Sequence, residues 1–310
     1  MPIPPRSGPP RSSRAGLGWL VLAAVCWGTS GTLGVGLRGS SGLGLLAAGG
    51  YRLLVGGVLM LAFAATVRRL RLPRTASGWR RVLALGIATS AFQAAFFSAI
   101  GFVGVSVATL VTIGSSPAMV LAVEAATGRQ RLTGRLAASL VLAVVGLGLL
   151  AGSPPPGLSA RDAAIGTALA FTAGASFAAI SLLGANPVPD FDDTTGTGLA
   201  FVGGGVLVLS SAAVTGSIAF VPTAASIALL VGLGLVPSAV AYLAYFRGLR
   251  TQTGTVGSIV SLLEPTTAAI LAAAVLGERL TAPALVGACL LITAVALTAL
   301  GPRQLETATR

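Results

Sequence analysis

Two charged side chains lie deep inside apolar stretches of this sequence. Glu264, followed by Pro265, interrupts the stretch "SLLEPTTAAILAAAVLGERL" at residues 261–280, and Arg52 lies about ten residues into the stretch that contains "AAGGYRLLVGG". If these stretches cross a membrane, a charge at the helix centre costs roughly 2.5–3.5 kcal/mol, so each is expected to face a partner or water. A carboxylate and a guanidinium at similar depth could form an ion pair or could each contact a polar substrate.

Both charges also have a simpler explanation. The guanidinium of Arg52 could extend toward the outer headgroups, as long basic side chains do near membrane surfaces. Glu264 could be a buried, protonated acid that caps a local kink in its helix. These alternatives stand beside the hypothesis that the two residues face a central cavity.

Two prolines are the second feature with chemical consequences. Pro117 and Pro265 have no amide hydrogen, so the carbonyls of Ile113 and Ser261 lose their usual helical partners. In lipid, such carbonyls must bond to protein or to water in a cavity. A tolerated kink is one explanation. We favour a helix break at a binding site, because the two prolines correspond in the internal repeat described below.

Polar and aromatic residues at similar depth complete the candidate cavity. The indole N–H of Trp27 needs an acceptor away from lipid. Taken singly, each of these residues is more often a helix-packing residue than a ligand. The full set of predicted substrate-binding residues is Trp27, Arg52, Gln93, Phe96, Tyr242, Tyr245, Ser261 and Glu264.

The composition identifies the elements that must position these residues. Of 310 residues, 54% are hydrophobic and only 9% are charged, and the mean hydropathy is +0.90. Soluble domains carry roughly 25% charged residues, so this chain is an integral membrane protein. It contains no histidine, which excludes metal sites, proton relays and catalytic triads that are built on histidine. We expect no cofactor and no metal.

Ten stretches are long and apolar enough to cross the membrane as helices, each of about 20 residues. We predict an all-α membrane fold with a disordered cytoplasmic tail at 1–16, a five-helix unit at 17–151, a proline-rich linker at 152–162, a second five-helix unit at 163–301 and a tail at 302–310. The predicted spans are 17–37, 43–67, 82–103, 105–126, 133–151, 163–184, 196–217, 224–246, 255–276 and 283–301.

The arginines predict the orientation of these spans. All twenty basic residues are arginines, and the net charge is +12. They form short clusters between the spans and not a basic stripe with interleaved aromatics, so nucleic acid is not expected as a partner. With a cytoplasmic N-terminus, the outside loops receive only Arg38, Arg161 and Arg279. Both termini are therefore predicted to be cytoplasmic in the cell membrane. The inside loop "GANPVPDFDDTTG" at 184–196 is an oddity, because it holds three aspartates and no arginine.

The second half of the sequence repeats the first. A shift of 148 residues places Ser90 on Ser238, Pro117 on Pro265 and "RLT" at 131–133 on "RLT" at 279–281, and a shift of 150 places Trp27 on Phe177. Five spans per unit is an odd number, so the second unit enters the membrane from the opposite side. In transporters, such inverted repeats place the substrate site near the bilayer midplane, between the halves.

The stretch "LLEPTTAAILAAAVLGERLTAPALVGACLLITAVAL", residues 262–297, resembles the EamA-type family of the drug/metabolite transporter superfamily. "CWGTSGTLG" and "YRLLVGGVLML" also resemble the family's first and second helices. The resemblance implies ten helices, cytoplasmic termini and export or exchange of small metabolites such as amino acids. It further implies a cavity lined by helices one, three, four, six, eight and nine. The first half departs from the pattern, because Gln130 stands where an acid is expected.

A small-molecule exporter that works by alternating access is therefore the predicted function, and no enzyme activity is expected. The alternatives are an intramembrane lipid-modifying enzyme and a non-transporting scaffold. Intramembrane acids for catalysis are scarce, and we expect Glu124 to pair with Arg129 or Arg131. The chain contains no GxxxxGK[ST] phosphate loop, so energy must come from a gradient or from exchange, by proton antiport, substrate exchange or facilitated diffusion. In the first case Glu264 is the predicted proton carrier. We expect a monomer or weak dimer.

Overall fold

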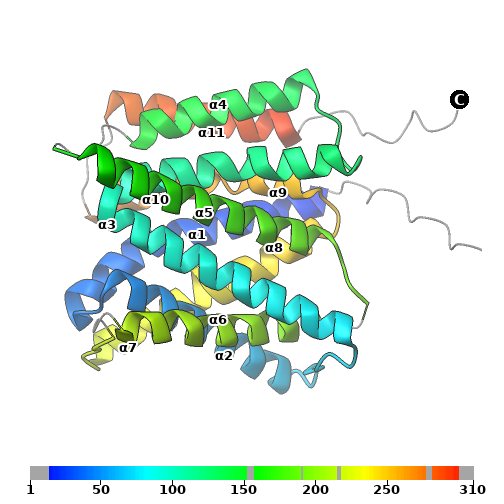
Figure 1. Ribbon diagram of the computed structural model, residues 1–310, viewed down its shortest axis with the longest axis vertical. Helices are drawn as coiled ribbons and strands as arrows, with labels where there is room; N and C mark the ends of the chain where they lie inside the picture. Colours follow the sequence, from blue (N-terminus) through cyan, green and yellow to red (C-terminus); the bar gives the residue numbers. More distant parts are fainter. Residues whose placement is uncertain (1–13, 152–156, 190, 215–217, 277–280, 300–310) are drawn as a thin grey trace, which may run out of the picture.

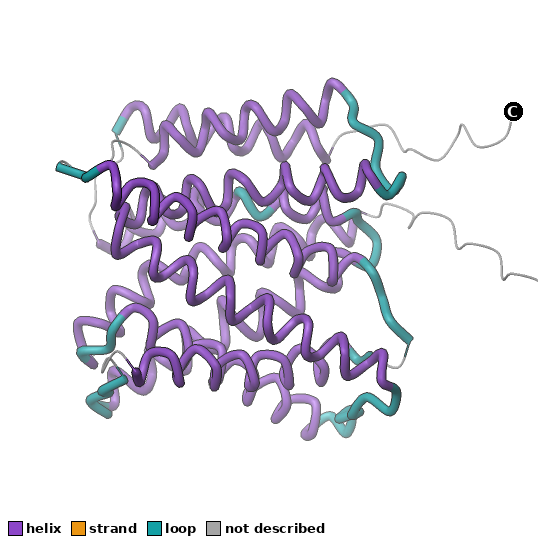
Figure 2. Tube along the Cα trace, viewed as in Figure 1, coloured by secondary structure: helices purple, strands orange, loops and turns teal. Residues whose placement is uncertain are grey.

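The computed structural model describes residues 14–151, 157–189, 191–214, 218–276 and 281–299. Within these ranges every regular element is a helix (Figure 2). The predicted motif residues Gly277, Glu278, Arg279 and Leu280 lie outside them, as do Asp190 and most of both tails. The first helix begins at Arg14, three residues before the predicted start.

The helices follow one another along the chain with short connections. Ser159, Thr223 and Thr253 cap the helices that they precede, each by accepting a hydrogen bond from a backbone N–H in the first turn. The elements are α1 (Arg14–Ser41), α2 (Leu45–Thr66), α3 (Ala76–Ala126), α4 (Gly134–Ala151), α5 (Ala160–Ala185), α6 (Asp193–Val214), α7 (Ala224–Gly234), the π-helix η1 (Leu235–Val240), α8 (Ala241–Leu249), α9 (Gly254–Val260), α10 (Leu263–Leu276) and α11 (Ala282–Ala299).

Helix α3 is two membrane passes in one element. Its 51 residues would extend about 76 Å as a straight helix, far beyond a hydrocarbon core about 30 Å thick. The chain reverses at Gly104, where φ is 77° and ψ is 168°, a conformation that side chains other than hydrogen rarely tolerate. In the described ranges nine segments qualify as spans by length and composition. Counting the two arms of α3 separately gives the predicted ten.

The remaining passes are built from several elements. Helices α7, η1 and α8 form one continuous pass, and α9 and α10 form another that is interrupted at Ser261 and Leu262. Both composite passes belong to the second half. The corresponding passes of the first half are the two arms of α3.

The helices pack symmetrically (Figure 1). Helices α4 and α11 pair at one edge and α2 and α6 near the other, while α1, α3, α5, α8 and α10 lie between them. In the centre, α1 packs on α8 and α10, and α5 packs on both arms of α3. If each helix is replaced by its repeat equivalent in the other half, every one of these pairs becomes a pair that is also in contact. The predicted fold, with two inverted five-helix units, is confirmed.

Glycine contacts between α2 and α6 show the symmetry residue by residue. A Cβ at Gly57 would lie 2.7 Å from the carbonyl oxygen of Gly198, and one at Gly205 would lie 3.0 Å from that of Gly50. The 148-residue shift converts the first pair into the second. Such close backbone approach is how membrane helices gain packing contacts without a hydrophobic driving force.

The valine substitution Gly205→Val tests this contact. A Cβ at Gly205 would lie 2.7 Å from the backbone nitrogen of Leu54. We therefore expect the free energy of unfolding to fall by about 1–3 kcal/mol, because the valine overpacks this contact. Thermal unfolding in detergent would measure it. Gly203→Val is the matched control, because Gly203 is exposed on the same helix with nothing within 4 Å. Equal melting temperatures for the two variants would contradict the packing.

One end of the molecule collects most of the arginines, and we call it the arginine-rich end. Helix α1 begins there and α11 ends there, beside the connections 67–75, 127–133 and 250–253 (Figure 1). The arginines in or next to these connections are Arg68, Arg69, Arg71, Arg74, Arg80, Arg81, Arg129, Arg131, Arg135, Arg247 and Arg250.

Candidate functional site

Glu264 lies at a break in its membrane pass. Helix α9 ends at Val260 and α10 begins at Leu263, so Glu264 and Pro265 belong to the first turn of a new helix. Proline is tolerated there, because first-turn amides have no helical acceptor. The Ser261 carbonyl, expected to be orphaned, accepts the Glu264 amide at 2.9 Å. Discontinuous helices of this kind form the binding sites of many transporters.

The first half differs from this arrangement. Helix α3 continues through Pro117, which is buried, and the freed carbonyl of Ile113 accepts a hydrogen bond from the Ser116 hydroxyl at 3.3 Å. The structure therefore departs from the expected pair of matching breaks. The serine that supplies this local bond stands where the second half has Glu264, so the two halves differ in backbone shape as well as in charge.

Arg52 contacts the π-helix η1. Its Nε donates to the Ser238 hydroxyl at 3.0 Å and its Nη2 to the Pro237 carbonyl at 3.1 Å. Pro237 has no amide hydrogen for the carbonyl of Leu233, which instead accepts from the Ser238 hydroxyl at 3.0 Å. The proline thus reshapes this pass, and the resulting turn holds the guanidinium. Arg52 does not merely extend toward lipid headgroups.

Arg52 and Glu264 are both half-buried and share Tyr242 as a neighbour. The three side chains are close enough to interact electrostatically. No direct ion pair joins Arg52 and Glu264 within the described ranges; the one ion pair found there involves other residues. The two charges are therefore separate contacts at one site, and the Glu264 carboxylate accepts no hydrogen bond from the described residues.

Aromatic rings fill the space between the halves. The Trp27 ring centroid lies 5.6 Å from that of Phe177, 5.2 Å from that of Tyr242 and 5.0 Å from that of Tyr245. All four side chains are buried. Trp27 and Phe177 occupy equivalent positions of the two halves, so their contact lies where the repeats meet. The Tyr245 hydroxyl is 2.7 Å from that of Ser181.

Three buried polar atoms near these rings have no hydrogen-bond partner: Trp27 Nε1, Ser30 Oγ and Thr266 Oγ1. Trp27 and Ser30 lie on α1 and Thr266 on α10, two helices in close contact, since a Cβ at Gly28 would lie 2.5 Å from that of Thr267. Buried polar groups are nearly always paired. A set of unpaired donors beside an unpaired carboxylate is suited to a polar ligand.

The other predicted residues have local partners. Gln93 is buried and donates to the Gly49 carbonyl at 3.3 Å, which joins α3 to α2. Phe96 stacks on Phe92 with centroids 5.9 Å apart, and the Ser261 hydroxyl donates to the Ser258 carbonyl at 2.7 Å. The structure brings together five of the predicted residues, namely Trp27, Arg52, Tyr242, Tyr245 and Glu264.

Five residues of the site were missed by sequence reasoning. Phe177 and Ser238 carried a signal, because the repeat aligns them with Trp27 and Ser90. Pro237 also carried a signal, because it is a proline inside a predicted span. Ser30 and Thr266 carried none, since a serine or threonine in an apolar stretch usually bonds to its own helix.

The expected pairing of Glu124 with nearby arginines is wrong. Glu124 is only 3% exposed and binds the start of α9. Its Oε1 accepts the Gly254 amide at 2.8 Å, and its Oε2 accepts the amide and the hydroxyl of Thr255 at 3.0 and 2.6 Å. The first amides of a helix lack backbone acceptors and carry the positive end of its dipole. Glu124 therefore joins the two halves at the arginine-rich end.

Ser238→Ala should impair the site more than Ser90→Ala. Ser238 accepts from Arg52, whereas its repeat equivalent Ser90 donates only to the carbonyls of Gly86 and Gly204. Loss of a charged hydrogen bond costs about 1.5–3 kcal/mol, so we expect substrate affinity to fall roughly tenfold or more in the Ser238 variant only. Binding to the two purified variants would measure this, and equal losses would contradict a special role for Arg52.

Comparisons with known proteins agree with this architecture. The model of the EamA-like transporter family matches twice, at residues 14–152 and 164–300. The uncharacterized transporter YwfM of Bacillus subtilis (strain 168) is 28% identical over 290 residues, covering 94% of this chain and 95% of that protein. A crystal structure of another protein superposes with a TM-score of 0.77 at 15% identity, over 93% of this chain and 98% of the other. This last likeness concerns the fold alone.

Proposed function

Because the chain belongs to the EamA-like transporter family, we propose that it moves a small polar or amphiphilic metabolite across the cell membrane by alternating access. The observation that carries this proposal is the set of unpaired buried atoms on α1 and α10, namely Trp27 Nε1, Ser30 Oγ and Thr266 Oγ1, together with the half-buried Glu264 carboxylate on α10. A scaffold would have no reason to leave these groups without partners, because each unpaired buried polar atom costs stability.

The substrate site lies between α1, η1, α8 and α10. Glu264 accepts from a donor group of the substrate, such as an ammonium, and the rings of Trp27, Tyr242 and Tyr245 pack on its apolar part. Arg52, held by Ser238 and Pro237, supplies a cation beside the carboxylate. A molecule with an amine and an apolar body, such as an amino acid or a lipophilic amine, fits this chemistry.

Alternating access requires the contacts at one end to break while those at the other form. In the structure Glu124 joins the halves at the arginine-rich end through three hydrogen bonds. We assign this end to the cytoplasm from its arginines. Release of Glu124 from α9 then opens the site inward, where an exported substrate enters. Protons or a counter-substrate return in the opposite direction.

Counterflow in proteoliposomes tests the proposal. Purified protein is reconstituted with amino acids, nucleosides or lipophilic cations inside, and uptake of the labelled compound is measured. We expect accumulation for one amine-containing class and none with Thr266→Phe, which would fill the site. Failure of every class, with protein shown to be folded, would favour the scaffold.

A further inference from the structure

A cavity on the outer surface of the helix bundle has a lining that includes neither Arg52 nor Glu264. It has a volume of about 700 Å³ and runs between the first arm of α3 and α5. Ala84, Ala88 and Ala91 form one wall, and Ala175 and Ala179 are part of the other. These α3 positions span about 10 Å along the helix axis. The cavity is therefore a shallow apolar groove that follows the helices.

Arg81 closes the groove at the arginine-rich end. Its side chain is 9% exposed, and its buried Nε has no hydrogen-bond partner. The guanidinium lies over the Phe191 ring, 5.6 Å from the centroid. A buried guanidinium with an unused donor is costly unless an anion or another acceptor completes it.

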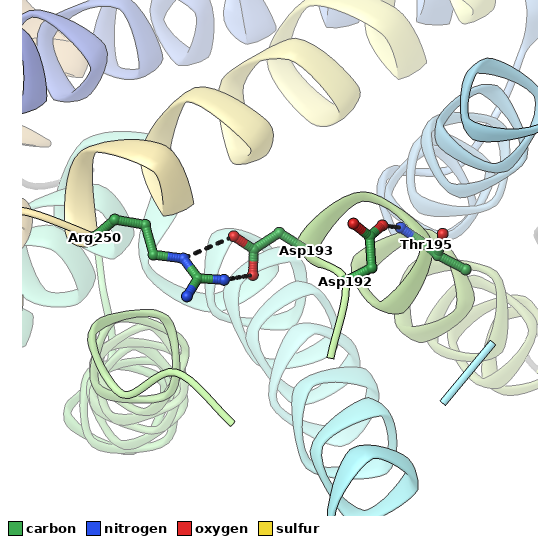
Figure 3. A network of polar contacts seen from close by, with 4 residues as sticks. All are labelled: Asp192, Asp193, Thr195 and Arg250. Atoms are coloured by element: carbon green, nitrogen blue, oxygen red, sulfur yellow. Dashed lines mark hydrogen bonds and ion pairs between the residues drawn. The ribbon is translucent and has the colours of Figure 1, made fainter. Parts of the chain in front are cut away.

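Positive charge dominates the surroundings of Arg81. Arg250 binds Asp193 through two hydrogen bonds, from Nε at 3.0 Å and from Nη2 at 2.7 Å (Figure 3). Asp192 accepts the Thr195 amide at 2.8 Å (Figure 3). Asp193 lies within electrostatic range of Arg81, but both of its carboxylate oxygens accept hydrogen bonds from Arg250. Arg69 and Arg247 line the neighbouring cavity with these aspartates, so arginines outnumber acids here among the residues that the structure describes, which do not include Asp190.

The other half of the protein has no equivalent of this site. The repeat aligns Arg81 with Leu229. It aligns Asn186, which also lines the groove, with Gly36. Those two partners touch, because a Cβ at Gly36 would lie 3.4 Å from the methyl carbons of Leu229. The fold therefore does not require a cation at this position.

We infer that the groove binds a membrane phospholipid with an anionic headgroup, whose phosphate is held by Arg81 and whose acyl chain lies along α3 and α5. The depth is suitable, because Trp79, two residues before Arg81, is 48% exposed and tryptophan prefers the headgroup layer. Exposed Ile87 and Phe171 place the groove on the lipid-facing side. Basic pockets between helices are known to select anionic lipids.

Native mass spectrometry of the full chain tests this inference. The protein is released from micelles that contain equal amounts of dioleoylphosphatidylglycerol and dioleoylphosphatidylcholine, which share their acyl chains and differ in headgroup charge. We expect about fivefold preferential retention of phosphatidylglycerol, because its headgroup is a net anion, whereas the choline ammonium offsets the phosphate charge that Arg81 would contact in phosphatidylcholine. An excess of inorganic phosphate should not displace the lipid, because the acyl chain contributes to binding. Displacement would overturn the groove assignment.

Arg81→Gln should remove the preference, and Arg80→Gln should keep it. The two changes remove the same charge at adjacent positions, but Arg80 is exposed. Equal retention of both lipids by the unmodified protein, or equal loss in both variants, would overturn the inference.

A groove-filling variant provides an independent test in case Arg81→Gln does not fold. Ala175→Phe places a ring in the groove at an exposed position and should reduce retention of both lipids. Ala168→Phe, on an exposed part of the same helix outside the groove, should not. Unchanged retention in Ala175→Phe would also overturn the inference.

Discussion

Glu264→Gln is expected to abolish the dependence of transport on a pH gradient. Glutamine keeps the length and shape of the side chain but cannot take up or release a proton. Glu264 is the carboxyl group at the break between α9 and α10, it accepts no hydrogen bond from the described residues, and it lies within electrostatic reach of Arg52. The other carboxyl group buried in a membrane pass, Glu124, is fully engaged by α9. Flux driven by a pH gradient should fall to that of protein-free vesicles.

Ser116→Ala is the matched control, because the repeat aligns Ser116 with Glu264 and its hydroxyl makes only a local bond to Ile113. This variant should keep its gradient dependence. Transport is compared in proteoliposomes with and without an imposed gradient, after chromatography has shown each variant to be folded. Gradient dependence that survives unchanged in Glu264→Gln would remove Glu264 as the proton carrier.

Glu124→Gln is expected to destabilise the protein by about 3 kcal/mol. An amide cannot accept from all three donors of Gly254 and Thr255, and its own N–H₂ group would face a backbone N–H. Hydrogen bonds to a charged group contribute about 1.5–3 kcal/mol each, and a buried donor left unpaired adds to the loss. The melting temperature in detergent should fall by several degrees.

Asp193→Asn is the control for this second prediction. Both carboxylates lie at the arginine-rich end, but Asp193 belongs to an exposed ion pair with Arg250, whose side chains are 27% and 39% exposed. Exposed pairs contribute about 0–1 kcal/mol. A loss in Glu124→Gln no larger than that in Asp193→Asn would show that the contact with α9 does not hold the two halves together.

The fold could be predicted because its signals are local and repeated. Apolar stretches of the right length identify the passes, and the turn near Gly104 was placed correctly although no polar loop marks it. The repeat then fixed the relation between the halves. The shift also converts the contact of Gly57 with Gly198 into that of Gly50 with Gly205, so one of these contacts predicts the other.

The candidate site was less predictable, because its contacts join residues far apart in sequence. Glu124 has arginines five and seven residues away, yet binds backbone amides 130 and 131 residues away. Amide groups at the start of a helix are part of the backbone, so no residue type in the sequence marks them as partners for Glu124. The oddity of the acidic inside loop has a similar cause, because Asp193 pairs with Arg250 from the next connection on the same side.

The central claim is that a polar site between the two halves is exposed alternately to each side of the membrane. Exposure of the site can be measured directly with the variant Thr266→Cys. The two native cysteines of the chain, Cys26 and Cys289, are replaced by alanine. A membrane-impermeant thiol reagent is added to either side of oriented vesicles. We expect labelling from both sides, slowed by the transported compound. Labelling from one side only, in protein that still transports, would contradict the account.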